Sequence, residues 1–88
     1  MAQPVPEYVA LGRAVRQIRS ERGLSQENLA LEAGLDRTYV SGIERGRRNP
    51  SYGSLLKLAL ALEVKASLII STAEDLSEYE DDTGLVGP

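Results

Sequence analysis

The 88 residues are enough for one small domain with a modest core and too few for two. The chain contains no cysteine and no histidine, which excludes a disulfide framework and a thiolate metal site and removes the commonest general base. An enzyme is therefore disfavoured, and neither a metal nor any other cofactor is implied.

The charge is distributed unevenly along the chain. Ten Lys and Arg stand against thirteen Asp and Glu, for a net charge of -3. Residues 1–72 hold all ten basic residues and seven acidic ones, which gives +3, whereas residues 73–88 hold six acidic residues and no basic one, which gives -6. The sequence therefore predicts a mildly basic body followed by an acidic tail.

The apolar stretches fall short of the roughly 20 residues that span a bilayer. Residues 1–8 lack the basic and apolar stretches of a signal peptide. We expect a cytoplasmic protein with no membrane partner, in which residues 1–7 form a flexible leader.

The first helix is predicted over residues 8–22. Leu11, Val15 and Ile18 recur there at helical spacing, while four arginines face elsewhere. Gly23 is expected to end this helix, because glycine readily takes the left-handed conformation of a helix C-terminus.

Two short helices follow, predicted over residues 26–33 and 37–45. Ser25 and Asp36 are good N-caps for them, and Gly34 between them can adopt a positive φ at low cost. The side chains expected to face the core are those of Leu29, Ala30, Ala33, Val40 and Ile43.

A fourth helix is predicted over residues 52–64, capped by Ser51, and a fifth over residues 65–76. The remaining segment, residues 77–88, is acidic and poor in apolar residues, so we expect it to be disordered. The apolar stripe of the fourth helix consists of Leu55, Leu58, Ala59 and Leu62.

Two short helices joined by a tight glycine turn indicate a helix-turn-helix at about residues 25–45, within a domain expected over residues 8–76. With the apolar residues pointing inward, the third predicted helix presents a polar outer side. The residues expected on that side are Arg37, Thr38, Tyr39, Ser41 and Gly42.

The stretch "LSQENLALEAGLDRTYVSGIERGRRNPSYGSLLKLALAL" closely resembles the lambda-repressor-like, Cro/C1-type helix-turn-helix family, also called the XRE family. The matching motifs are "SQE" with "LA", the "AG" turn, "YVS" with "IERG", and "NPS" before a leucine-rich helix. The resemblance as a whole covers residues 11–70, about two thirds of the chain. Within that family, "LDRTYVSGIERGRRNP" looks most like the controller proteins of restriction-modification systems. The resemblance implies an all-α, five-helix domain that binds double-stranded DNA as a homodimer on a pseudo-palindromic operator.

The resemblance also implies roles for individual residues. The third helix would lie in the major groove, where Arg37 can make a bidentate contact to guanine. The base-contacting residues would be Arg37, Thr38, Tyr39 and Ser41. The phosphate-contacting residues would be Gln26, Arg45, Arg47, Arg48 and Asn49.

Several of these roles have alternatives in the sequence. Arg48 or Asn49 could reach a base or the minor groove instead of a phosphate, and Tyr39 could pack at the edge of the core. Glu44 is expected to form a structural ion pair with Arg13 or Arg16, as acids at this position do in the family.

The fifth predicted helix offers more apolar surface than a short terminal helix needs to bury. Leu68, Ile69 and Ile70 are therefore predicted to form a dimer interface, with the monomer core as the alternative for the two isoleucines.

The functional prediction is a homodimeric transcriptional regulator, associated with the nucleoid in the cytoplasm and autoregulatory, with no small-molecule ligand. One rival is an antitoxin or adaptor that uses the same fold to bind a protein, such as a toxin or RNA polymerase. The other rival is an enzyme that uses paired carboxylates such as Glu78 and Glu80, which is disfavoured because no core surrounds them.

Overall fold

The computed structural model of the chain describes residues 6–77. These residues form five α-helices and no strand, which confirms the all-α, five-helix prediction. The helices are α1 (Pro6–Glu21), α2 (Gln26–Ala33), α3 (Arg37–Glu44), α4 (Tyr52–Leu62) and α5 (Ala66–Leu76).

The N-terminal boundary of the domain differs from the prediction. Pro6 and Glu7, assigned to a flexible leader, are the first residues of α1. Proline suits this position because its fixed φ is helical and its missing N–H has no partner in the first turn. The rest of the predicted leader, and the acidic tail beyond Ser77, lie outside the described residues.

The expected caps are present at α2, α3 and α4. Ser25 Oγ accepts the N–H of Asn28 at 3.0 Å, and Asp36 Oδ1 accepts the N–H of Thr38 at 2.8 Å. Ser51 Oγ accepts the N–H of Ser54 at 3.0 Å. Each bond satisfies a backbone donor that the first helical turn leaves free.

The fourth helix is shorter than predicted. It ends at Leu62 because Glu63 adopts a left-handed conformation, with φ of 59° and ψ of 40°. The N–H of Glu63 then bonds the carbonyl of Leu60 at 3.1 Å, and the N–H of Val64 bonds the carbonyl of Ala59 at 3.0 Å. These bonds satisfy carbonyls at the helix end and turn the chain towards α5.

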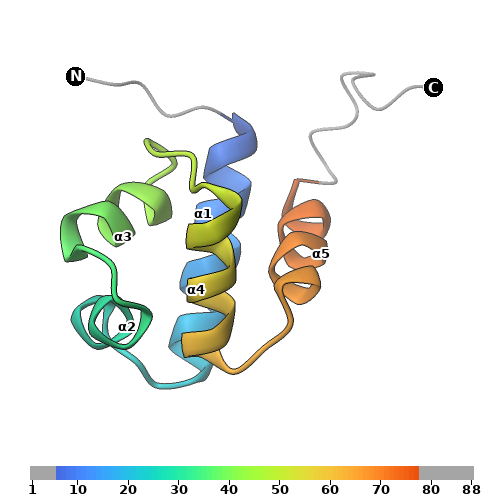
Figure 1. Cartoon of the computed structure of the whole chain (residues 1–88). Coiled ribbons are helices and arrows are strands. Elements are labelled where there is room, and N and C mark those ends of the chain that lie inside the picture. The colour runs from blue at the N-terminus through green and yellow to red at the C-terminus, as the bar shows by residue number, and fades with distance from the viewer. Residues whose placement is uncertain (1–5, 78–88) are drawn as a thin grey trace.

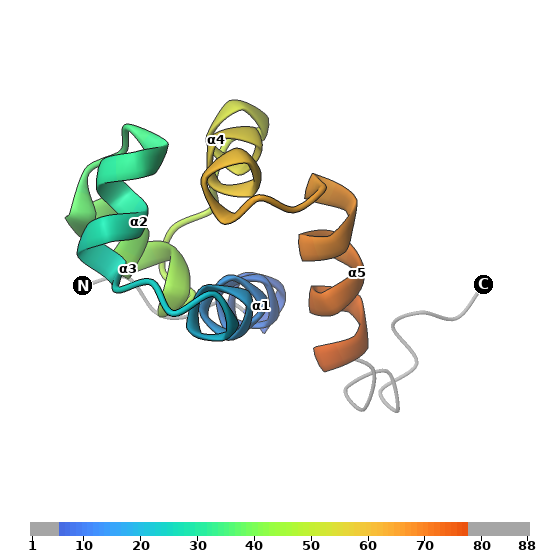
Figure 2. The same cartoon turned by 90° about the horizontal axis from the view of Figure 1, so that it is seen from below.

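The helices surround a single core. In Figure 1, α2 and α3 lie on one side of α1 and α4, and α5 lies on the other. Figure 2 shows α1 and α4 on opposite sides of the centre of the molecule, with α5 closing one end. The largest fully buried side chains are Leu29, Ile43, Leu58, Leu62, Ile69, Val15 and Val40, contributed by all five helices.

The assignment of Ile69 to a dimer interface was wrong. Its side chain is fully buried in the core of a single chain, so it has no surface to offer a partner. Leu68 and Ile70, its neighbours on α5, are exposed. Helix α5 therefore completes the core of the monomer. None of the helices in the described range is long and apolar enough to cross a membrane.

Candidate nucleic-acid interface

The turn between α2 and α3 is tight and left-handed. Gly34 has φ of 69° and ψ of 33°, and the N–H of Leu35 bonds the carbonyl of Ala30 at 2.9 Å. The small side chain of Ala30 is buried where the two helices approach. The sequence "AG" thus fixes how α3 leaves α2, as the helix-turn-helix prediction requires.

A buried acid joins three helices beneath α3. Glu44 has a side chain only 2% exposed, and Arg19 of α1, 13% exposed, donates to both of its oxygens at 2.7 and 3.1 Å. The amide nitrogen of Gln26 donates to Glu44 Oε1 at 2.8 Å. Arg19 also donates to the carbonyl of Leu24 at 2.7 Å. This network ties the end of α3 to the end of α1 and the start of α2.

The predicted partners of Glu44, Arg13 and Arg16, were wrong. The carboxylate lies beside Leu24 and Gln26, at the junction of α1 and α2, and Arg19 is the α1 arginine at that end. Arg13 and Arg16 lie nearer the start of α1, and both are exposed. The expectation of a structural acid paired with an arginine of the first helix is correct.

The crossing of α1 and α3 depends on Gly12. An added Cβ at this glycine would lie 2.7 Å from the carbonyl oxygen of Glu44 and would also collide with the carbonyl oxygen of Ile43. Because those atoms belong to the backbone, no side-chain rotation can relieve the contact. This role of Gly12 was not predicted, although a glycine in the middle of a predicted helix can indicate close approach of another segment.

The outer side of α3 is polar. Arg37 and Thr38 are exposed, and Tyr39 and Ser41 are half-buried. Gly42, expected on the same side, is buried beneath Arg48, so its assignment to the open surface was wrong. The four residues predicted to contact bases therefore all have accessible surface, and Arg37 projects from the first turn of the helix.

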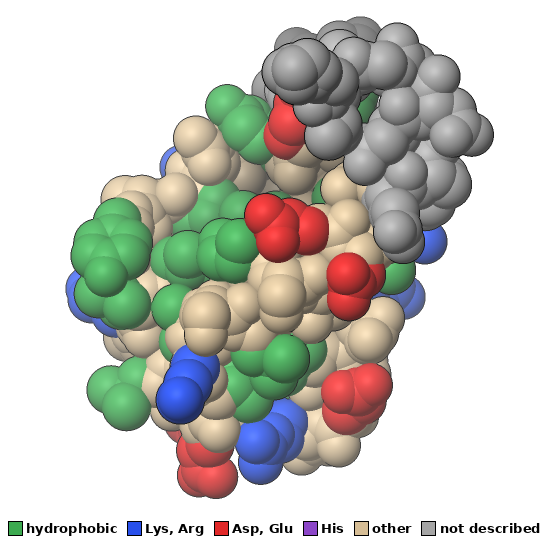
Figure 3. Space-filling view, turned by 90° about the vertical axis from the view of Figure 1, so that its right-hand side faces the viewer, with side chains coloured by type: hydrophobic (Ala, Val, Ile, Leu, Met, Phe, Trp, Pro, Cys, Tyr) green, Lys and Arg blue, Asp and Glu red, His purple; other side chains and the backbone are tan. Residues whose placement is uncertain are grey.

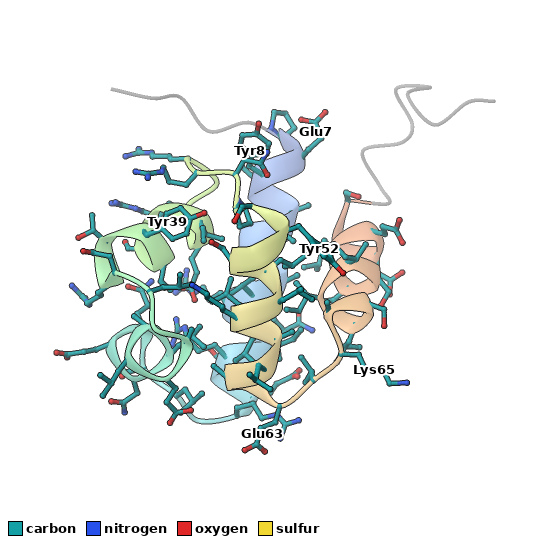
Figure 4. All side chains as sticks on the ribbon, in the orientation of Figure 1. Glu7, Tyr8, Tyr39, Tyr52, Glu63 and Lys65 are labelled. Carbon is teal, nitrogen blue, oxygen red and sulfur yellow. The ribbon has the colours of Figure 1, made fainter. Side chains whose placement is uncertain are left out.

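The loop after α3 packs back on Tyr39. The guanidinium carbon of Arg48 lies 5.1 Å from the centroid of the Tyr39 ring, and the N–H of Ser51 bonds the Tyr39 hydroxyl at 3.4 Å. Figure 4 shows Tyr39 on α3 on the side of this loop. The alternative that Tyr39 packs at the edge of the core is partly correct, since it contacts the core while keeping exposed surface.

The other predicted phosphate contacts differ in exposure. Arg45 is exposed, whereas Arg47 is half-buried and its Nε has no hydrogen-bond partner within the described part of the chain. Asn49 lines a hollow of about 440 Å³ between the start of α1 and the end of α5. Gln26 is half-buried, and its amide keeps a second N–H beyond the one donated to Glu44.

The basic residues of this surface are not neutralised by the protein. Over residues 6–77, no carboxylate forms an ion pair with Arg37, Arg45, Arg47 or Arg48. By contrast, Arg19 of α1 pairs with Glu44, and Arg22, just after α1, pairs with Glu63. The arginines near α3 therefore leave a positive charge that suits a polyanion.

A second exposed surface is apolar, and we call it the α4–α5 face. Along α4, Tyr52, Leu56 and Leu60 recur at every fourth residue, and Tyr52 and Leu60 are 74% and 80% exposed. Leu68 and Ile70 add apolar surface from α5. Figure 4 shows Tyr52 between α4 and α5, and Figure 3 shows hydrophobic side chains gathered on the side of the molecule that carries α5. The exposed α4 residues were not predicted, although their i, i+4, i+8 spacing can be read from the sequence.

Known proteins are similar to this chain in fold and in sequence. Residues 15–69 match the family described as Helix-turn-helix. The control protein C.BamHI of Bacillus amyloliquefaciens is 53% identical over 55 residues, which are 61% of this chain and 68% of that protein. The restriction-modification controller protein C.AhdI from Aeromonas hydrophila has a crystal structure with 46% identity and a TM-score of 0.73, covering 74% of this chain and 98% of that one.

A further solved structure is that of the controller protein C.Esp1396I as a tetramer in complex with its natural 35 base-pair operator. It has 36% identity and a TM-score of 0.73, covering 80% of this chain and 92% of that one. These relatives are control proteins and not enzymes.

The fold, the glycine turn and the four arginines on and after α3 together define a helix-turn-helix DNA-binding transcriptional regulator. The chain belongs to the Cro/C1-type (XRE) helix-turn-helix family. Within it, the chain is closely related to the restriction-modification controller proteins.

Proposed function

We propose that this protein is a restriction-modification controller that binds a pseudo-palindromic operator as a homodimer and regulates its own promoter. Its site of action would be the bacterial nucleoid, in the cytoplasm. The observation that carries the proposal is the set of four arginines on and after α3 that have no acidic partner in the described residues. The relationship to controller proteins, one of them solved on its operator, supports the finer assignment.

The contacts to DNA would divide by position on this surface. Arg37 and Thr38, in the first turn of α3, have the exposure needed to enter the major groove and read base edges. Tyr39 and Ser41 would complete the base-contacting set. The phosphate contacts would come from Gln26, Arg45, Arg47, Arg48 and Asn49.

The Glu44 network supports the role of Gln26. One N–H of its amide is already held by Glu44, and the half-buried side chain keeps a second N–H that can donate to a phosphate. A phosphate bound there would contact a group fixed to both α1 and α3 through Arg19 and Glu44. The network would thereby transmit the position of the DNA backbone to the recognition helix.

Dimerisation would use the α4–α5 face. Leu68 and Ile70 on α5 and the stripe on α4 expose apolar surface that a monomer leaves in water. In the proposed dimer, a two-fold axis through this face has the direction that brings both copies of α3 to the same side. Two such helices can read two half-sites of a palindrome.

The test is a fluorescence-anisotropy titration of the full chain with the DNA upstream of its own gene and with a scrambled duplex. We expect tighter binding to the upstream DNA by at least about 1,000-fold and a steep, log-linear loss of affinity with salt. Equal and weak binding to both duplexes, with little dependence on salt, would contradict the proposal. That outcome would instead favour the antitoxin or adaptor alternative.

A further inference from the structure

Gly42 lies in the middle of α3 and is buried beneath the side chain of Arg48. An added Cβ at Gly42 would lie 2.5 Å from Cγ of Arg48, closer than real Cβ contacts allow, and 3.5 and 3.6 Å from its Cβ and Cδ. The stem of the arginine therefore occupies the space that any other residue at position 42 would fill.

Arg48 is held at three points. Its backbone N–H bonds the carbonyl of Gly42 at 3.2 Å, its stem lies against Gly42, and its guanidinium lies over the ring of Tyr39. The ring is itself fixed, because its hydroxyl accepts the N–H of Ser51 at 3.4 Å. An arginine on an open surface would lose much rotamer freedom on binding a phosphate, and this packing removes that freedom beforehand.

The packing leaves the charge of Arg48 available. The residue as a whole is exposed, and no carboxylate within residues 6–77 pairs with it. A guanidinium that lies over an aromatic face keeps N–H donors available for hydrogen bonds to another group. The arrangement thus presents donors beside α3 without neutralising them.

We infer that Gly42 is a positioning residue that acts through Arg48: its missing side chain seats the arginine stem, and the Tyr39 ring then aims the guanidinium at a DNA phosphate. The inference rests on the proposed function. Gly42 itself is buried and has no side chain with which to touch DNA, so any effect of changing it must travel through its neighbours.

The test is a double-mutant cycle with Gly42→Ala and Arg48→Ala in the full chain, using a duplex enriched by the wild-type protein from a random-sequence pool. We expect Arg48→Ala to weaken binding about tenfold and to lower the salt slope. Gly42→Ala should weaken binding several-fold on its own and less than about twofold in the Arg48→Ala background. Equal losses in both backgrounds, no loss, or tighter binding by Gly42→Ala would overturn the inference.

Two further measurements separate positioning from folding. Alanine has a higher helix propensity than glycine, so Gly42→Ala should not lower the Tm. The matched control is Gly53→Ala on α4, where only Ser51 Oγ lies near the added Cβ, and it should leave affinity unchanged. In the free wild-type protein, NMR relaxation of the arginine Nε groups should show Arg48 more ordered than exposed Arg45. Equal mobility of the two would overturn the inference whether or not Gly42→Ala folds. If wild type enriches and binds no duplex, the proposed function fails, and the relaxation measurement still decides the positioning of Arg48.

Discussion

Glu44 joins the end of the recognition helix to α1 and α2. Its carboxylate receives hydrogen bonds from Arg19 and Gln26 at the junction of three helices. Because both side chains of the ion pair are largely buried, loss of one partner leaves the other charge buried without an opposite charge.

We therefore predict that Arg19→Ala lowers the free energy of unfolding by about 3 kcal/mol, measured by urea denaturation, with a similar loss for Glu44→Ala. The double variant should lose less than the sum of the two, because the second change removes a charge that is already unpaired. The exposed pair of Arg22 and Glu63, at 3.9 Å, is the control, and Arg22→Ala should cost about 1 kcal/mol or less. Equal costs for Arg19→Ala and Arg22→Ala would contradict this account of Glu44.

The sequence predicts which residues take part in this site better than it predicts which arginine pairs with Glu44. The exposed residues at the start of α3 follow from local patterns, and the structural role of Glu44 follows from the resemblance to the family. The choice of Arg19 over Arg13 and Arg16 depends on where α1 crosses α3, and Gly12 sets that crossing through contacts with the backbone of Ile43 and Glu44. Such a contact between distant segments has no local signature beyond the glycine itself.

At the scale of the helices, the cap residues predict the N-terminal ends of α2, α3 and α4. Ser25, Asp36 and Ser51 all accept the hydrogen bonds expected of them. The C-terminal end of α4 could not be predicted in this way. Glu63 takes the left-handed conformation that usually favours glycine, and it does so because Val64 packs against the core beyond it.

This end of α4 gives a prediction on stability. Glu63→Gly removes the Cβ that is strained at φ of 59°, whereas Glu63→Ala keeps it, and both variants lose the same carboxylate. The glycine variant should therefore be more stable than the alanine variant by about 1 kcal/mol, measured by urea denaturation. Equal stability of the two would show that the left-handed conformation carries no cost here.

For the whole molecule, the core and the proposed dimer surface are separate although they share α5. Ile69 belongs to the core, while its neighbours Leu68 and Ile70 are exposed. The sequence alone could not tell the buried residue from the exposed ones, because all three neighbours on this short helix are apolar. A test of dimerisation that deletes α5 would therefore unfold the monomer, and single surface changes are needed.

We predict that Leu60→Lys shifts the protein from dimer to monomer in sedimentation at micromolar concentration and leaves its far-UV circular dichroism unchanged. A charge placed at this 80% exposed position costs the monomer little and opposes burial against a partner. Leu31→Lys, on α2 and 78% exposed, is the matched control and should remain dimeric. Dimerisation by Leu60→Lys with wild-type affinity would exclude this part of the face.

The central claim, that the outer side of α3 reads DNA sequence, is tested most directly by the discrimination of Arg37→Ala between the protein's own upstream DNA and a scrambled duplex. Because Arg37 is exposed in the first turn of α3 and has no acidic partner in the described range, its loss should reduce that discrimination by about 1 to 3 kcal/mol. Arg16→Ala, which removes the same charge from the exposed side of α1, should leave discrimination unchanged. If the two variants lose discrimination equally, or neither loses any, α3 does not read the sequence as proposed.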